Sequence, residues 1–125
     1  MGIKGALLLD SRPLVVVPEL AVAIGLGEAI ILQQVHYWLE INRRENRNYR
    51  DGFTWTYNSV AEWQKQFPFY TTKTIQRVIT KLENQGILIS NVYNKGNFDR
   101  TKWYRIDYDA LEIALGQNVP IDNQS

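Results

Sequence analysis

Residues 71–88 of the 125-residue chain read TTKTIQRVITKLENQGIL, and the rest of the domain can be placed around this stretch. Its apolar residues repeat at the spacing of a single helix face: Ile75, Val78, Ile79 and Leu82. A threonine before them can cap the helix, and Gly86 supplies a left-handed residue after it. The stretch therefore predicts a helix that stops at a turn and leads into a strand.

The opposite face of this helix is polar and contains no carboxylate. It consists of side chains that can all form hydrogen bonds: Thr72, Lys73, Gln76, Arg77, Thr80, Lys81 and Asn84. Base edges and phosphates in a major groove are read by such donors on long side chains. An ordinary solvated face would include acidic residues, whereas the first acid here is Glu83 on the flank. We therefore expect residues 71–85 to form a DNA-reading helix.

The neighbouring segments have their own start and stop signals. Ser59 and Glu62 have the spacing of a capping box, and the short helix that they open must end before Pro68. Residues 87–93 and 102–108 are predicted strands on either side of a polar loop, which together make a β-hairpin with a basic tip. The order in this half of the chain is thus helix, turn, helix and hairpin.

The remaining elements are predicted from breakers and periodicity. A short helix is expected over residues 18–25, between a proline and a glycine, and a longer one from Glu28 to about Asn42. Residues 43–51 are predicted to be an arginine-rich loop, and residues 52–57 a strand of alternating aromatic residues and threonines. A second capping box, Asp109 to Glu112, predicts a last short helix closed by Gly116.

Charge is distributed unevenly along the chain. The net charge is only +1, but residues 71–106 contain seven Lys and Arg against two Asp and Glu. A basic segment of this kind points to a polyanionic partner. The net charge alone would have concealed this preference.

The composition and motifs exclude several classes of function. Without cysteine the chain has no disulfide, no thiolate metal site and no cysteine nucleophile, and its single histidine, His36, is expected to be structural and hydrogen-bonded by a neighbour. No phosphate-binding loop or zinc-protease motif is present, so we expect no enzyme activity, no cofactor and no metal. The start of the chain lacks a signal-peptide layout, and no apolar run reaches about 18 residues, which favours a soluble intracellular domain with no membrane contact.

Three stretches resemble a known family. Residues 24–39, IGLGEAIILQQVHYWL, are similar to the first part of the N-terminal domain of phage replisome-organiser (replication initiation) proteins, which are related in organisation to the primosomal protein DnaD. Residues 74–88 resemble the recognition helix and first wing strand of that domain, and residues 100–108 resemble its return strand. The likeness extends from residue 13 to about residue 115. It implies a winged helix that binds origin DNA, self-associates and helps to load the replicative helicase, in the cytoplasm of a bacterial host.

The expected fold is accordingly α+β and mainly helical: a winged helix-turn-helix with a C-terminal β-hairpin wing and extra N-terminal helices. Residues 1–12 would be an N-terminal segment, residues 13–115 the DNA-binding domain, and residues 116–125 a flexible linker to a C-terminal region outside this chain. Two alternatives remain open: a transcriptional regulator with the same fold, or a winged helix used only for protein–protein contact.

The expected partner is double-stranded DNA with an origin-like site. Residues 71–85 would lie in the major groove and the wing, residues 94–102, on the backbone. The predicted DNA contacts are Thr71, Thr72, Lys73, Thr74, Gln76, Arg77, Thr80, Lys81, Lys95, Asn97, Arg100 and Lys102. Residues 13–42 carry surplus apolar and aromatic side chains, which predicts a homodimer or higher oligomer. The helicase or its loader would be reached through the C-terminal region.

Overall fold

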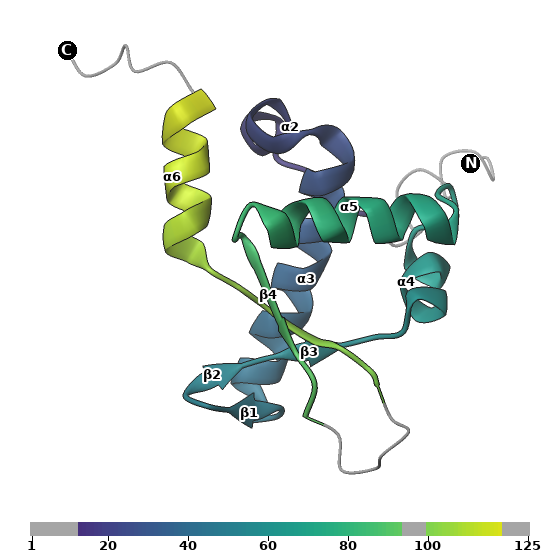
Figure 1. Cartoon of the computed structure of the whole chain (residues 1–125), viewed down its shortest axis with the longest axis vertical. Coiled ribbons are helices and arrows are strands. Elements are labelled where there is room, and N and C mark those ends of the chain that lie inside the picture. Colours follow the sequence, from purple (N-terminus) through teal and green to yellow (C-terminus); the bar gives the residue numbers. More distant parts are fainter. Residues whose placement is uncertain (1–12, 94–99, 119–125) are drawn as a thin grey trace, which may run out of the picture.

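The computed structural model describes residues 13–93 and 100–118, and within them it has five helices and two small antiparallel sheets (Figure 1). The helices are α2 (Pro18–Ile24), α3 (Leu26–Arg44), α4 (Val60–Gln66), α5 (Thr72–Asn84) and α6 (Tyr108–Asn118). The strands are β1 (Tyr49–Arg50), β2 (Phe53–Thr54), β3 (Thr56–Tyr57), β4 (Leu88–Asn91) and β5 (Trp103–Ile106). The predicted α+β class is confirmed.

The larger sheet has three antiparallel strands in the order β3–β5–β4. Tyr57 lies opposite Trp103 in one pair of strands, and Leu88 lies opposite Ile106 in the other. The two strands predicted at residues 87–93 and 102–108 are therefore confirmed as an antiparallel pair, each shorter than expected. Lys95 and Asn97 belong to the segment between them that lies outside the described residues.

The hydrophobic core lies where α3, α4 and α5 pack together over β4 and β5. Figure 1 shows α5 crossing α3, with α4 beside one end of α5. All four apolar residues of the predicted helix face are buried: Ile75, Val78, Ile79 and Leu82. Trp63 in α4 and Phe67, which follows the last residue of α4, are buried with them. The helical spacing in the sequence thus identified the inner face of α5 correctly.

Hydrogen bonds fix the start of α4 and the turn that leads from α4 to α5. The Ser59 hydroxyl accepts the Glu62 N–H at 3.1 Å, and the Glu62 carboxylate accepts the Ser59 N–H at 2.8 Å, so the predicted capping box is confirmed. Helix α4 ends before Phe67, as Pro68 predicted. The Gln64 amide then donates to the Tyr70 carbonyl at 3.0 Å. This last bond links α4 to Tyr70, two residues before α5 begins.

Helix α3 begins two residues earlier and ends two residues later than predicted. Gly25, with φ of 107°, forms the break between α2 and α3. Gly27, the residue before the predicted start at Glu28, lies inside the helix. A Cβ atom at Gly27 would be 3.1 Å from the Tyr70 hydroxyl oxygen, so this glycine lets α3 approach Tyr70 closely.

Residues 43–57 differ most from the prediction. The expected loop contains the end of α3 and strand β1, which pairs with β2 in a hairpin. Asp51 and Gly52 at its tip both have positive φ, 54° and 82°, as the Asp-Gly pair of a tight hairpin turn requires. The predicted strand over 52–57 is divided at Trp55, whose N–H donates to the Asn48 carbonyl and whose carbonyl accepts the Asn42 amide. The two halves therefore pair in different sheets.

The cap of α6 was placed incorrectly. The Asp107 side chain accepts the Ala110 N–H at 3.1 Å, so the cap lies two residues before the predicted Asp109. The Asp107 N–H donates to the carbonyl of Ile87, the residue before β4, at 2.9 Å. This bond fixes the position of Asp107 at the start of the helix. Helix α6 also continues past Gly116 to Asn118. Residues 119–125 of the predicted linker and the predicted segment 1–12 lie outside the described residues.

Candidate nucleic-acid interface

The outer face of α5 is the polar face that the sequence predicted. Its exposed side chains are Thr72, Lys73, Gln76, Arg77, Thr80, Lys81 and Asn84. The start of the helix is held by Thr71, whose hydroxyl accepts the Thr74 N–H at 3.1 Å and lies 3.0 Å from the Thr74 hydroxyl. Both of these predicted contact residues therefore already serve as the helix cap.

A hollow of about 460 Å³ joins α5 to the base of the hairpin. It is lined by Val60, Lys73, Gln76, Arg77, Ile79, Thr80, Glu83, Lys102 and Tyr104. Arg100 lies in an adjoining hollow, which also includes Ser59 and Lys102. The fold thus brings residues from α5, the start of α4 and the strand after the hairpin loop to one region of the surface.

Two of the predicted cations are already paired with acids. Lys81 Nζ lies 2.9 Å from a carboxylate oxygen of Glu28, and Lys102 Nζ lies 2.7 Å from one of Glu83. Lys73 and Arg77 form no ion pair with any carboxylate in the described part of the chain. The predicted cations therefore differ in availability, and the two unpaired ones on α5 lie nearest to its start.

Sequence reasoning missed the role of both acids. Glu28 lies on α3 and its side chain is mostly buried, so no spacing within α5 could have pointed to its contact with Lys81. Glu83 was noted as the first acid on the flank of the helix, but Lys102 lies on another element. Both pairs form only because the tertiary fold brings α3 and the hairpin next to α5.

The pairing of Lys81 gives a testable expectation. We expect Glu28→Gln to free Lys81 for phosphate contact and to steepen the fall of log affinity for duplex DNA with log salt by up to about one unit. Lys81→Ala should change duplex affinity less than Lys73→Ala does, because Lys81 is already neutralised. Fluorescence anisotropy over a salt series measures both effects. Equal losses for Lys73→Ala and Lys81→Ala would contradict this expectation.

Tyr104, which lines the α5 hollow, has a strongly shifted acidity. Burial raises the pKa of its hydroxyl to about 12, and the Glu83 carboxylate adds to the effect. The unfolded chain loses this proton near pH 10, whereas the folded chain keeps it until about pH 12. Between these pH values we therefore expect the free energy of unfolding of the wild-type chain to fall by up to about 2 kcal/mol more than that of Tyr104→Phe. Urea unfolding of both chains at several pH values measures this. Parallel pH profiles for the two chains would contradict it.

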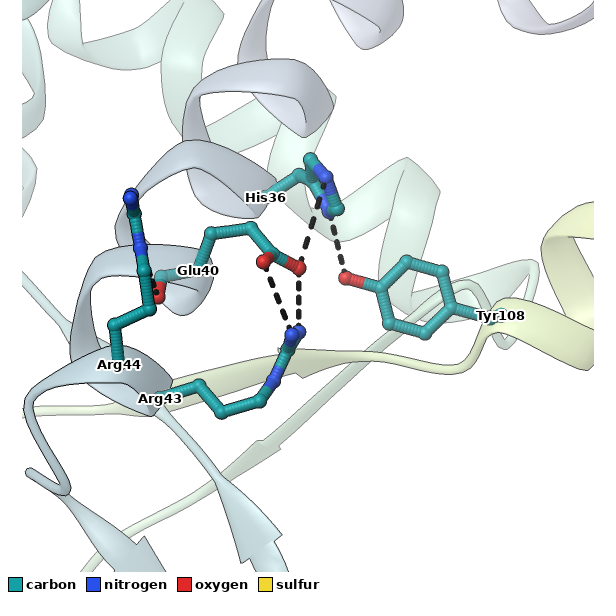
Figure 2. A network of polar contacts seen from close by, with 5 residues as sticks. All are labelled: His36, Glu40, Arg43, Arg44 and Tyr108. Carbon is teal, nitrogen blue, oxygen red and sulfur yellow. Dashed lines mark hydrogen bonds and ion pairs between the residues drawn. The ribbon is translucent and has the colours of Figure 1, made fainter.

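A second polar network joins α3 to the start of α6 (Figure 2). His36 Nδ1 lies 2.8 Å from the Tyr108 hydroxyl, which agrees with a structural, hydrogen-bonded histidine. Arg43 donates two hydrogen bonds to the Glu40 carboxylate, at 3.0 and 2.5 Å, and these lower the pKa of Glu40. Arg44 Nε donates to the Glu40 carbonyl at 3.4 Å. Burial raises the pKa of Tyr108 above its ordinary value.

Within residues 13–93 and 100–118, no three His, Asp or Glu residues gather in a way that could hold a metal ion. None of the helices in those same ranges combines the length and apolar character that crossing a bilayer requires.

Comparison of this chain with models of protein families, with curated proteins and with solved structures returns no match.

Proposed function

We propose that this chain is a duplex-DNA-binding domain of the winged-helix type that acts in the initiation of replication. One observation carries the proposal: the exposed face of α5 has no acid, and its Lys73, Gln76 and Arg77 line a hollow at the base of the hairpin. The acid that lines this hollow, Glu83, is engaged by Lys102. A helix inserted in a major groove needs donors on this face, and a basic hairpin beside it can meet the phosphate backbone.

The order of the elements supports the winged-helix part of the proposal. Helix α3 is followed by the β1–β2 hairpin and β3, then by α4 and α5, and then by the antiparallel pair β4 and β5, with β5 in the centre of the three-stranded sheet. In this arrangement α4 and α5 correspond to a helix-turn-helix and the segment between β4 and β5 to a wing. The role in replication rather than transcription rests on the resemblance of residues 24–39 to phage replisome organisers.

The proposal is tested by selecting duplexes from a random library with the whole chain and measuring the affinity by anisotropy. We expect the selected duplex to bind more tightly than its scrambled version, and both to weaken as salt is raised from about 50 to 200 mM. Salt-sensitive binding of equal strength to both duplexes would mean that the chain contacts the DNA backbone and does not recognise the base sequence. If neither duplex binds, the DNA-binding proposal is wrong.

Self-association is a separate part of the proposal. Val22 in α2 is 76% exposed and Leu26 at the start of α3 is 57% exposed, and the two residues are four positions apart in the chain. We expect the chain to sediment as a dimer or larger species and Val22→Asp to shift it towards monomer. Val92→Asp, at an exposed apolar residue beyond β4, is the matched control. A wild-type chain that sediments only as monomer would contradict this part.

A further inference from the structure

A second hollow, of about 770 Å³, lies between the end of α3, the β1–β2 hairpin and the start of α6. It shares no lining residue with the hollow beside α5. Tyr104 lines the α5 hollow whereas the next residue of β5, Arg105, lines this one. The two hollows are therefore separate parts of the surface.

Aromatic rings gather at the second hollow. Tyr49, Phe53 and Tyr108 line it and are 63%, 47% and 42% exposed. The buried side chains of Leu39 and Ile106 supply an apolar floor. Exposed rings above an apolar floor offer a surface on which a flat aromatic group can stack.

Guanidinium groups line the same hollow. The Arg105 guanidinium lies 3.7 Å from the centre of the Phe53 ring, and its buried Nε has no hydrogen-bond partner within the described residues. Arg47 contacts Glu45 through one nitrogen at 2.8 Å, which leaves other N–H groups of this side chain available, whereas Arg43 is held by two bonds to the Glu40 carboxylate.

Carboxylates reduce the positive charge of this hollow. Asp107 and Asp109 also line it, and Asp107 is engaged as the cap of α6. Charge alone would therefore not attract a simple anion strongly. A ligand that combines a flat ring with a phosphate fits better, because it uses the exposed rings and the guanidinium donors together.

We propose that this second hollow binds an unpaired nucleotide, with the base stacked on Tyr49 and the phosphate held by Arg47 and Arg105. Bases within a duplex are stacked on their neighbours and are not free for this contact, whereas single-stranded nucleic acid and free nucleotides present both groups. The site is separate from the duplex contact proposed for α5 and does not depend on it.

The test uses the whole chain with a short fluorescent oligothymidylate, and thymidine monophosphate as the free nucleotide. We expect Tyr49→Ala and Arg47→Gln each to weaken oligothymidylate binding about fivefold or more, and Tyr49→Phe to retain it. Tyr37→Ala is the matched control, because Tyr37 is 43% exposed and lies outside the hollow. Thermal unfolding of every variant is measured to check that the fold is retained.

The two sources of the ligand are distinguished by calorimetry. Binding of the monophosphate that depends on Tyr49 indicates a free-nucleotide site, and binding of the oligomer alone indicates a single-strand site. Oligomer affinity that is unchanged by Tyr49→Ala and Arg47→Gln, or that falls only with Arg77→Ala on α5, overturns the proposal. If the oligomer binds in a way that depends on Tyr49 but no duplex binds, the result supports this site and rejects the function proposed for α5.

Discussion

Substitution of Arg77 by alanine is expected to weaken binding to the selected duplex by about tenfold to a hundredfold, and binding to scrambled duplex much less. Arg77 is exposed on α5, lines the hollow shared with Lys102, and is not paired with any acid of the described residues. An arginine that makes two hydrogen bonds to guanine contributes about 1–3 kcal/mol of discrimination. Anisotropy on both duplexes, over a salt series, measures the ratio of affinities.

Lys65→Ala is the control for this experiment. Lys65 is exposed at the end of α4 and lines a different hollow, with Leu14 and Phe69. We expect it to leave both affinities nearly unchanged. If Arg77→Ala weakens both duplexes by the same factor, Arg77 contacts only phosphate, and if it weakens neither, the assignment of this face to DNA is wrong. The same contrast could be applied to Lys95, which lies outside the described residues and which the sequence predicts to meet phosphate.

Phe67→Ala is expected to lower the free energy of unfolding by about 3–5 kcal/mol. The Phe67 ring is fully buried at the end of α4, and it lies parallel to the Trp63 ring with 6.0 Å between their centres. Its removal would leave a cavity where α4, α5 and α3 meet. Since domains of this size are stabilised by about 5–15 kcal/mol, the loss should be evident as a large shift of the urea midpoint.

Phe69→Ala is the matched control, two residues away and of the same type. The Phe69 side chain is 58% exposed, so its truncation should lower the free energy of unfolding by less than about 1 kcal/mol. Equal midpoints for Phe67→Ala and the wild-type chain would contradict the burial of Phe67. Equal losses for Phe67→Ala and Phe69→Ala would mean that the end of α4 packs differently.

Much of the local structure followed from the sequence because its causes are local. The capping box of Ser59 and Glu62, the stop before Pro68 and the inner face of α5 each depend on residues within one or two turns. Gly86 has the left-handed φ of 76° that its place after α5 predicted. Interactions between residues three or four apart are the same in the isolated segment and in the fold, so the pattern of residue types was enough.

The errors occurred where distant residues compete for the same backbone groups. The strand over 52–57 is broken because Asn42 and Asn48 bind the peptide groups of Trp55. The cap of α6 falls at Asp107 because Ile87 holds its N–H. The Asp51–Gly52 turn, by contrast, has a local cause, because an Asp-Gly pair favours a tight hairpin turn.

For the candidate interface, the sequence by itself determined the acid-free face of α5 and its basic character, since helical periodicity decides which side chains share a face. Only the tertiary structure decided which cations are available. Glu28 reaches Lys81 from α3, and Glu83 on α5 reaches Lys102 at the base of the hairpin. Both contacts require separate elements of the chain to pack side by side. The hollow beside Arg105 arises in the same way, because α3, the β1–β2 hairpin and α6 enclose it only when folded.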